Sequence, residues 1–336
     1  MIKEYLKLAR LSIAPLTGLA PVTGAIATGQ YQILHLIILF LIGILGHSYG
    51  IVHNDIIDYN LDKNIKDFVE RPLVSGTITK KKAWIFALGC LIAMFAFSTY
   101  LADSNHNYYS IIFLIVPVIC VTLYNITSKK IPLTDSFLAI GMFFLIFYGS
   151  SIHISNLKQI PFLVWIICFL GAVQVFLLNV IAGGFKDIEN DYLKGAKTFA
   201  VRMGLQVKEN KLFISYKFKI IAYILQLFNL SFAFLPFILL PNFALPIIFR
   251  YSLIFVLTII SIFVIFLLVK YLNLTNSERG TIRKLINLQG YLNFILAPIL
   301  LMTITLYAII IIIIPGLGFF LYNILFHEKF LEPSNM

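Results

Sequence analysis

Charged residues are scarce in this chain: of its 336 residues only 12% are Asp, Glu, Lys or Arg, whereas 60% are hydrophobic. A soluble globular chain carries about 25% charged residues, so this one has about half the charge that a water-facing surface needs. The deficit excludes a soluble enzyme. With a mean hydropathy of +0.92, the length leaves room for about nine membrane helices of roughly 20 residues and for no large soluble domain.

Cysteine is also scarce, with three residues in the whole chain. Each lies inside an apolar run, without a partner at the spacing of a metal site or a disulfide. We therefore interpret all three as small apolar residues. They are Cys90, Cys120 and Cys168.

Acidic residues are fewer than basic ones: 15 Asp and Glu against 26 Lys and Arg give a net charge of +11. In a soluble protein this excess would suggest a nucleic-acid partner. In a membrane protein it has a simpler explanation, because cytoplasmic loops collect Lys and Arg. We therefore predict a lipid bilayer as the surroundings and no nucleic-acid partner.

Long apolar runs are what the sequence has in abundance. Nine of them, bounded by charges or by Pro, Gly and Asn, are membrane-span candidates. The first follows Lys3, Lys7 and Arg10 as a secretory signal would, but Pro15 and Gly18 interrupt it, so we interpret it as a membrane helix. We expect a transmembrane domain over residues 1–312 and an interfacial tail over 313–336. The expected spans are 11–29, 33–54, 83–102, 109–126, 135–153, 161–184, 219–240, 246–270 and 288–312.

The basic residues are sorted between the two sides of these spans. The N-terminal segment and the connections after the second, fourth, sixth and eighth spans hold 23 of the 26 Lys and Arg. Cytoplasmic loops carry such an excess, so the pattern predicts a multi-pass membrane protein with its N-terminus on the cytoplasmic side. The three remaining cations are Lys158, Arg250 and Lys329.

Six of the 15 acids fall in two short clusters, at the ends of the second and sixth spans and on the same predicted cytoplasmic side. In the first cluster Asn54, Asp58 and Asp62 recur every four residues, so they share one helix face, with Asp55 one step round. The second cluster repeats the four-residue spacing with Asp187 and Asp191.

Carboxylates one turn apart at the end of a membrane helix repel one another, so a cation should compensate them. Hard oxygen ligands at this spacing suit Mg²⁺, which bridges protein carboxylates to substrate phosphates. A solvated loop is the alternative for any single residue, but it explains the two clusters together poorly. Basic residues that would meet the remaining phosphate charge lie in the same connections. They are Arg71, Lys129, Lys130, Lys186 and Lys197.

These segments resemble the UbiA-type intramembrane prenyltransferases, in order along roughly residues 5–300. The first family motif reads N-D-I-I-D-Y-N-L-D over Asn54–Asp62, and R-P-L-V-S-G follows it over Arg71–Gly76. The second reads K-D-I-E-N-D-Y-L-K-G-A-K-T-F-A-V-R-M-G over Lys186–Gly204. Two long motifs in the right order on a chain of nine predicted spans make the resemblance specific.

The resemblance implies an all-α bundle of about nine transmembrane helices around a central cavity, open at the cytoplasmic face and laterally to lipid. It also implies Mg²⁺-dependent transfer of a polyprenyl group from an isoprenoid diphosphate donor to a lipophilic or aromatic acceptor, with release of diphosphate. The chemistry of the residues agrees. Cations and Mg²⁺ stabilise the charge that develops on the leaving diphosphate, and a water-free wall protects the prenyl carbon.

The resemblance also assigns roles residue by residue. Tyr124 departs from the family pattern, in which a lysine follows four residues after a tyrosine: here the lysines follow five and six residues later. Either lysine is therefore a candidate. The implied metal ligands are Asn54, Asp55, Asp58, Asp62, Asp187 and Asp191, and Asp58, Asp62, Asp187 and Asp191 are the implied catalytic acids. The implied diphosphate-binding residues are Arg71, Tyr124, Lys129, Lys130, Lys186 and Lys197.

Two further residues are weaker candidates for binding the acceptor. Arg10, at the cytoplasmic start of the first span, would meet an anionic acceptor, or it serves orientation alone. His47 shares a helix face with Asn54 and is either a general base or an interior histidine. The sequence does not separate an aromatic quinone precursor, which we slightly favour, from a prenylated glycerol phosphate of ether lipids.

Two other functions compete with prenyl transfer. A CDP-alcohol phosphotransferase is also membrane-bound and metal-dependent, but its D-G-x-x-A-R element does not follow Asp55 or Asp58. A cation-coupled transporter places its acids near the bilayer midplane. Here both acidic clusters lie at the ends of expected spans, within basic connections, which favours a diphosphate site.

Overall fold

In a computed structural model, most of the described chain is helical. The described residues are 2–63, 68–128, 130–154, 156–185, 188, 198–208, 211–239, 246–275 and 279–327. They form two compact units. Unit 1 comprises Met1–Ile126, Phe144–Val164 and Ile310–Met336, and unit 2 comprises Thr127–Phe143 and Trp165–Ile309.

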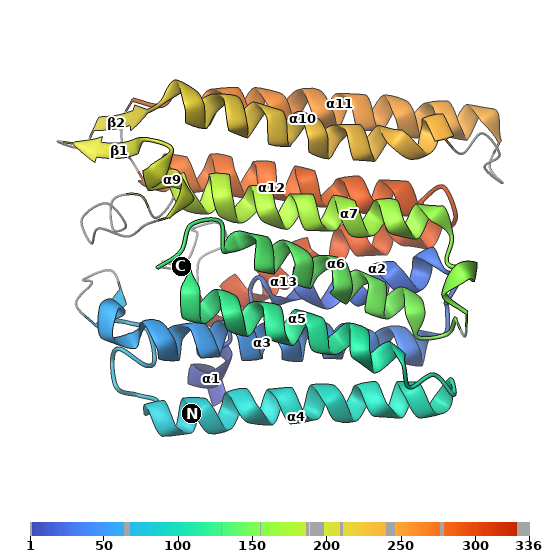
Figure 1. The fold of residues 1–336 in the computed structure, drawn as a ribbon, viewed down its shortest axis with the longest axis horizontal. Helices are drawn as coiled ribbons and strands as arrows, with labels where there is room; N and C mark the ends of the chain where they lie inside the picture. The colour runs from blue at the N-terminus through green and yellow to red at the C-terminus, as the bar shows by residue number, and fades with distance from the viewer. Residues whose placement is uncertain are drawn as a thin grey trace. The chain divides into compact units, whose positions relative to one another are not determined.

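Unit 1 is built around one long helix, α3, which packs against α2 and α4 (Figure 1). Helices α6 (Asp135–Ser151) and α7 (Phe162–Leu177) are divided between the two units. The remaining helices of unit 1 are α1 (Ile2–Leu8), α2 (Ala14–Ala27), α3 (Ile33–Asp62), α4 (Lys80–Ser104), α5 (Ser110–Thr127), η2 (Leu157–Gln159) and α13 (Ile309–His327).

In unit 1, helices α2 and α6 approach closely at glycines, which have no side chain to keep the two backbones apart. A Cβ added at Gly24 of α2 would lie 1.9 Å from the backbone oxygen of Ile146 in α6. A Cβ added at Gly149 of α6 would lie 1.8 Å from the backbone oxygen of Pro21 in α2. Small residues at such crossings are typical of membrane helix pairs, which gain stability from close packing rather than from the exclusion of water.

Unit 2 combines long helices with a short hairpin. In the hairpin β1 (Leu205–Lys208) pairs antiparallel with β2 (Lys211–Ile214), Leu205 opposite Ile214. The long helices α10 and α11 lie side by side, and both contact α12 (Figure 1). The helices of unit 2 are η3 (Leu178–Gly183), α9 (Phe199–Arg202), α10 (Tyr216–Leu239), α11 (Ile247–Leu272), α12 (Arg279–Leu301) and η4 (Leu306–Ala308).

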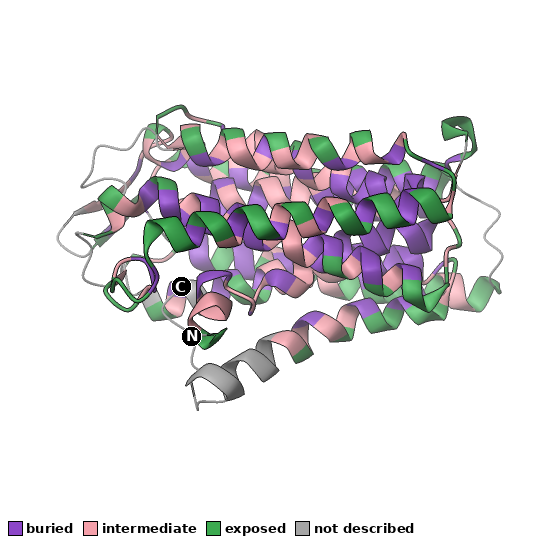
Figure 2. Cartoon of the chain, turned by 90° about the horizontal axis from the view of Figure 1, so that it is seen from below, coloured by how far each residue is buried: buried purple, intermediate pink, exposed green. Residues whose placement is uncertain are grey.

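The surface of the helices is apolar, as a lipid-facing surface should be. Along α4, Ala83, Ala87 and Met94 are buried, whereas Ile85 and Ile92 on another face of the helix are exposed (Figure 2). In water such exposed side chains would be unfavourable, whereas in lipid they are solvated. The burial pattern confirms an integral, multi-pass membrane protein.

Within the described residues, seven helices are long and apolar enough to cross a membrane, and three shorter apolar helices accompany them. The prediction of an all-α polytopic fold is confirmed. The number of nine spans stays a prediction. The shorter helices are Ala14–Ala27, Asp135–Ser151 and Leu306–Gly318.

Candidate active site

The first acidic cluster lies on the last two turns of α3, which ends at Asp62. Asp55 and Asp58 are buried, with 6% and 8% of their surface exposed, and Asn54 is half-buried. The last turn of α3 contains no basic residue. Since the C-terminal end of a helix carries a partial negative charge, buried acids there need cations from elsewhere in the fold.

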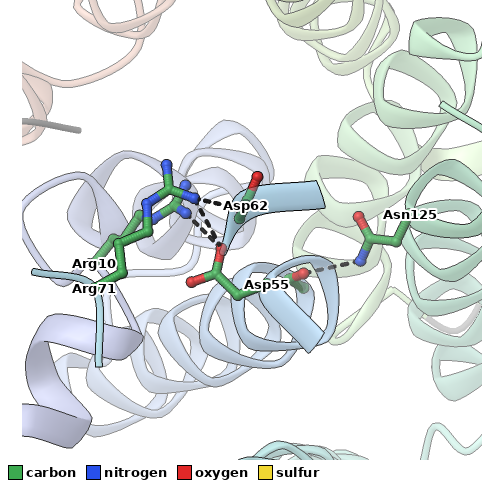
Figure 3. A network of polar contacts seen from close by, with 6 residues as sticks. Arg10, Asp55, Asp62, Arg71 and Asn125 are labelled. Carbon is green, nitrogen blue, oxygen red and sulfur yellow. Dashed lines mark hydrogen bonds and ion pairs between the residues drawn. The ribbon is translucent and has the colours of Figure 1, made fainter. Parts of the chain in front are cut away.

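The first of these cations comes from the turn between α1 and α2. Nη2 of Arg10 donates a hydrogen bond of 2.5 Å to Oδ1 of Asp55 (Figure 3). The contact joins residues 45 positions apart. Arg10, proposed from the sequence for acceptor binding, therefore lies at the first acidic cluster.

The second cation comes from the segment that follows α3. Nη1 of Arg71 donates to Oδ2 of Asp62 at 2.7 Å and lies 3.9 Å from Oδ1 of Asp55 (Figure 3). Its guanidinium also stacks over the ring of Phe68, 3.4 Å from the centroid. The structure thus brings Arg71 to the first cluster, as a diphosphate-binding residue requires.

Helix α5 is fixed beside α3 by an amide that the sequence reasoning missed. Nδ2 of Asn125, which is buried, donates to the backbone oxygen of Gly50 at 2.9 Å (Figure 3). It also lies 3.0 Å from Nδ1 of His53. The sequence feature that could have identified Asn125 is a polar amide residue inside an apolar run. Tyr124, the neighbouring residue, is half-buried, and Lys130 is exposed.

His47 is an interior residue of unit 1. Its Nδ1 lies 3.2 Å from Oγ1 of Thr17, which joins α3 to α2. Its Nε2 is buried beside the backbone of Ala9 and Arg10, outside normal hydrogen-bond geometry. His47 therefore supports the turn that carries Arg10, which agrees with the interior-histidine interpretation.

Several predicted site residues lie outside the described residues: Lys129, Lys186, Asp187, Asp191 and Lys197. The described segment before the second motif is η3, a π-helical turn that follows α7. Turns of this kind occur frequently at functional sites. The second motif thus follows a local departure from regular α-helix.

The first cluster matches Mg²⁺ in the kind of ligand it offers, since the metal prefers carboxylate and amide oxygens. Among the described side chains, no group of three His, Cys, Asp or Glu residues is placed to hold a metal ion. Asp55 and Asp62 instead contact arginines. The assignment of Asn54, Asp58 and Asp62 as metal ligands stays a prediction.

Comparison with known proteins identifies the family. The model of the UbiA prenyltransferase family matches residues 16–289. The chain belongs to this family. The predictions of the family and of a prenyltransferase activity are thereby confirmed.

Curated relatives of this UbiA member include proteins with two different named activities. Digeranylgeranylglyceryl phosphate synthase of Thermococcus kodakarensis is 27% identical over 212 residues, 60% of this chain and 69% of that protein. 4-Hydroxybenzoate octaprenyltransferase of Albidiferax ferrireducens is 26% identical over 184 residues, 53% of this chain and 58% of that protein. The two names imply different acceptors, one a glycerol phosphate and one an aromatic acid.

Solved structures share the fold. A UbiA homologue from Archaeoglobus fulgidus, bound to GPP and Mg²⁺, aligns with a TM-score of 0.63 at 16% identity, covering 89% of this chain and 99% of that one. At this identity the likeness establishes the fold alone. It agrees with the helical architecture of both units.

Proposed function

We propose that this protein transfers a polyprenyl group from an isoprenoid diphosphate to an anionic acceptor in a reaction that depends on Mg²⁺. The observation that carries the proposal is the cluster of acids at the end of α3, in which Asp55 pairs with Arg10 and Asp62 with Arg71, in a chain of the UbiA family. Buried acids and arginines concentrated at one helix end are what a metal-bound diphosphate requires.

The donor diphosphate has two sets of partners in this proposal. Asn54, Asp58 and Asp62 hold metal from the first motif, and Asp187 and Asp191 from the second. A bound divalent metal supplies electrostatic stabilisation of the charge on the leaving diphosphate. The A. fulgidus homologue was solved with GPP and Mg²⁺ bound, which supports an isoprenoid diphosphate and a divalent metal as the bound groups.

The chain's own cations take the remaining phosphate charge. Arg71 contributes a planar guanidinium, which matches phosphate oxygens with two parallel hydrogen bonds. Its contact with Asp62 supports the assignment, because the same carboxylate would orient the arginine until donor binds. The other proposed partners are Tyr124, Lys129 or Lys130, Lys186 and Lys197.

The acceptor is proposed to be anionic. A glycerol phosphate and a hydroxybenzoate, the acceptors that the names of the relatives imply, both carry a negative group. Arg10 is the candidate to bind that group, since it lies at the first cluster. The excess of cations on one side favours a site at the cytoplasmic face of the bilayer, where a long isoprenoid chain could remain in lipid.

The test uses purified protein in lipid nanodiscs with labelled geranylgeranyl diphosphate, Mg²⁺, and either 4-hydroxybenzoate or geranylgeranylglyceryl phosphate. We expect release of diphosphate with one acceptor and none after EDTA. Asp58→Asn should lower the rate about 100-fold or more, since it removes a charge at the reacting diphosphate. Asp103→Asn is the matched control, because that acid is exposed at the end of α4. Undiminished activity of Asp58→Asn and Asp191→Asn would contradict the metal assignment.

A further inference from the structure

Asp55 differs from the other polar residues of its cluster in the direction it faces. Asn54, Asp58 and Asp62 follow one another at four-residue intervals along one face of α3, and Asp55 is rotated by about 100° from Asn54. Its side chain faces the α1–α2 turn and Arg71 (Figure 3). Asp55 therefore lies between two arginines, 2.5 Å from Arg10 and 3.9 Å from Arg71, whereas Asp62 pairs with Arg71 at 2.7 Å.

The backbone at Arg10 supports a specific role for this contact. Arg10 has a φ of 45°, in the left-handed region that residues other than glycine rarely occupy. Hydrogen bonds fix the turn on both sides, from the Arg10 N–H to the Lys7 oxygen at 3.0 Å and from the Ile13 N–H to the Arg10 oxygen at 3.2 Å. A strained conformation persists only where its surroundings hold it. Here the ion pair with Asp55 is one such restraint.

Arg71 approaches the same carboxylate oxygen from another segment. Oδ1 of Asp55 lies 2.5 Å from Arg10 Nη2 and 3.9 Å from Arg71 Nη1. The two guanidinium groups therefore lie close to each other. Without an acid between them they would repel one another, and Asp55 reduces that repulsion.

We propose that Asp55 is a positioning residue, which holds Arg10 and Arg71 together as one binding site for a substrate phosphate or carboxylate and does not bind the metal. The inference rests on the proposed function and changes the role that the motif alone assigned to Asp55. A metal would have to break a buried ion pair in order to use Asp55, whereas Asp58, one turn further along α3, belongs to the face that the motif offers to metal.

The deciding experiment compares Asp55→Asn with Asp58→Asn in the diphosphate-release assay, with Mg²⁺ and prenyl diphosphate varied separately. For Asp55→Asn we expect a KM for the prenyl diphosphate or the acceptor at least 10-fold higher, a smaller change in kcat, and half-activation by Mg²⁺ within twofold of wild type. Asp55→Glu should restore most of the affinity. Asp58→Asn should raise the Mg²⁺ requirement instead.

Arg10→Gln gives a second, independent measurement. If Asp55 acts through Arg10, the two substitutions should not add. The double variant, Arg10→Gln with Asp55→Asn, should then bind substrate no more weakly than whichever single variant binds it more weakly. An Mg²⁺ half-activation shifted 10-fold by Asp55→Asn, or fully additive losses in the double variant, would overturn the proposal. Thermal melting of each variant shows whether it is folded. If Asp55→Asn does not fold, Arg10→Gln still tests the role of the ion pair in substrate binding.

Failure of the proposed function gives a different result. If the wild-type protein releases no diphosphate from any prenyl diphosphate, prenyl transfer is wrong, and binding of inorganic diphosphate without Mg²⁺ then tests the arginine pair alone. Wild type should bind it at least 10-fold more tightly than Asp55→Asn or Arg10→Gln. Equal binding by all three proteins would contradict the positioning role.

Discussion

Single residues in this protein show how polar groups survive in an apolar chain. Asp55 is buried and pairs with Arg10, and Asn125 is buried against the backbone of Gly50. The same rule holds at the opposite end of α3. There Nε2 of Gln30 lies 3.1 Å from Nδ1 of both His35 and His153. These side chains pair with one another because an unpaired polar group is costly in lipid.

The histidine cluster gives a prediction about pH. The Gln30 side-chain oxygen accepts from the Gln32 N–H at 2.9 Å, so its NH₂ group donates to both imidazoles, which must be neutral. Burial, with a smaller contribution from the nearby His35, lowers the pKa of His153 to about 4. Because the unfolded chain binds the proton more readily, stability is complete above the ordinary histidine pKa of about 6.5 and falls as the pH drops towards 4.

We expect the melting temperature in detergent to fall by several degrees between pH 7 and pH 4.5 through this residue. His153→Gln should make the melting temperature less dependent on pH across that range. His106→Gln is the matched control, because that histidine is exposed. An equal pH dependence in wild type and His153→Gln would show that the cluster does not govern acid stability.

The sequence was a good guide to the residue types of the site and a poor one to their pairing. Four-residue spacing placed Asn54, Asp58 and Asp62 on one face, because helical periodicity is a local property. The pairing of Arg10 with Asp55 joins positions 45 apart and depends on how the α1–α2 turn packs against α3. Periodicity along one helix carries no information about such a contact.

At the scale of elements, most of the expected spans agree with the helices to within about three residues, but the second and ninth do not. The ninth was expected over 288–312, whereas α12 ends at Leu301 and α13 begins at Ile309. Helix α3 continues to Asp62 instead of ending at residue 54, and α12 begins at Arg279 instead of residue 288. In both cases charged turns extend an apolar helix beyond the hydrophobic run. The hairpin of β1 and β2 was not expected, because its alternating residues include lysines that also suit a loop.

In unit 2, a network of hydrogen-bonded, buried side-chain amides connects α10 and α12 midway along both helices. Oδ1 of Asn293 accepts from the side chains of Gln226 and Asn229 at 2.9 Å each, and Gln289 donates to Gln226 at 3.2 Å. Gln226 and Asn229 are almost completely buried. Interhelical amide contacts of this kind stabilise membrane helix packing.

Replacement of the shared amide tests this role. Asn293→Leu leaves Gln226 and Asn229 without their acceptor, so we expect a loss of about 1–2 kcal/mol in stability, since single interhelical contacts contribute about 0.6 kcal/mol on average. Thermal or denaturant unfolding in mixed micelles measures the loss. Ser231→Ala is the matched control, because that hydroxyl is exposed on α10 and bonds only within its own helix. Equal stability of Asn293→Leu and wild type would show that the network contributes nothing to packing.

At the scale of the whole molecule, the distribution of the few charges predicts how the protein lies in the membrane. The N-terminal segment and alternate connections hold 23 of the 26 cations. Cations on these connections favour the cytoplasmic side. Lys81 begins α4 and Lys158 lies in η2, and both are exposed. Between them the chain passes through α4, α5 and α6, which predicts that they lie on opposite sides of the bilayer.

Cysteine labelling checks this topology directly, because the three native cysteines are buried and can be replaced. In such a background, Lys81→Cys should react with an impermeant maleimide only in inside-out vesicles, and Lys158→Cys only in right-side-out vesicles. Reaction of both from the same side would mean that α4, α5 and α6 make an even number of crossings. Reaction of each from the side opposite to the one expected would place Asp55, Asp58 and the arginines at the outer face, so that the donor would have to be supplied from outside the cell.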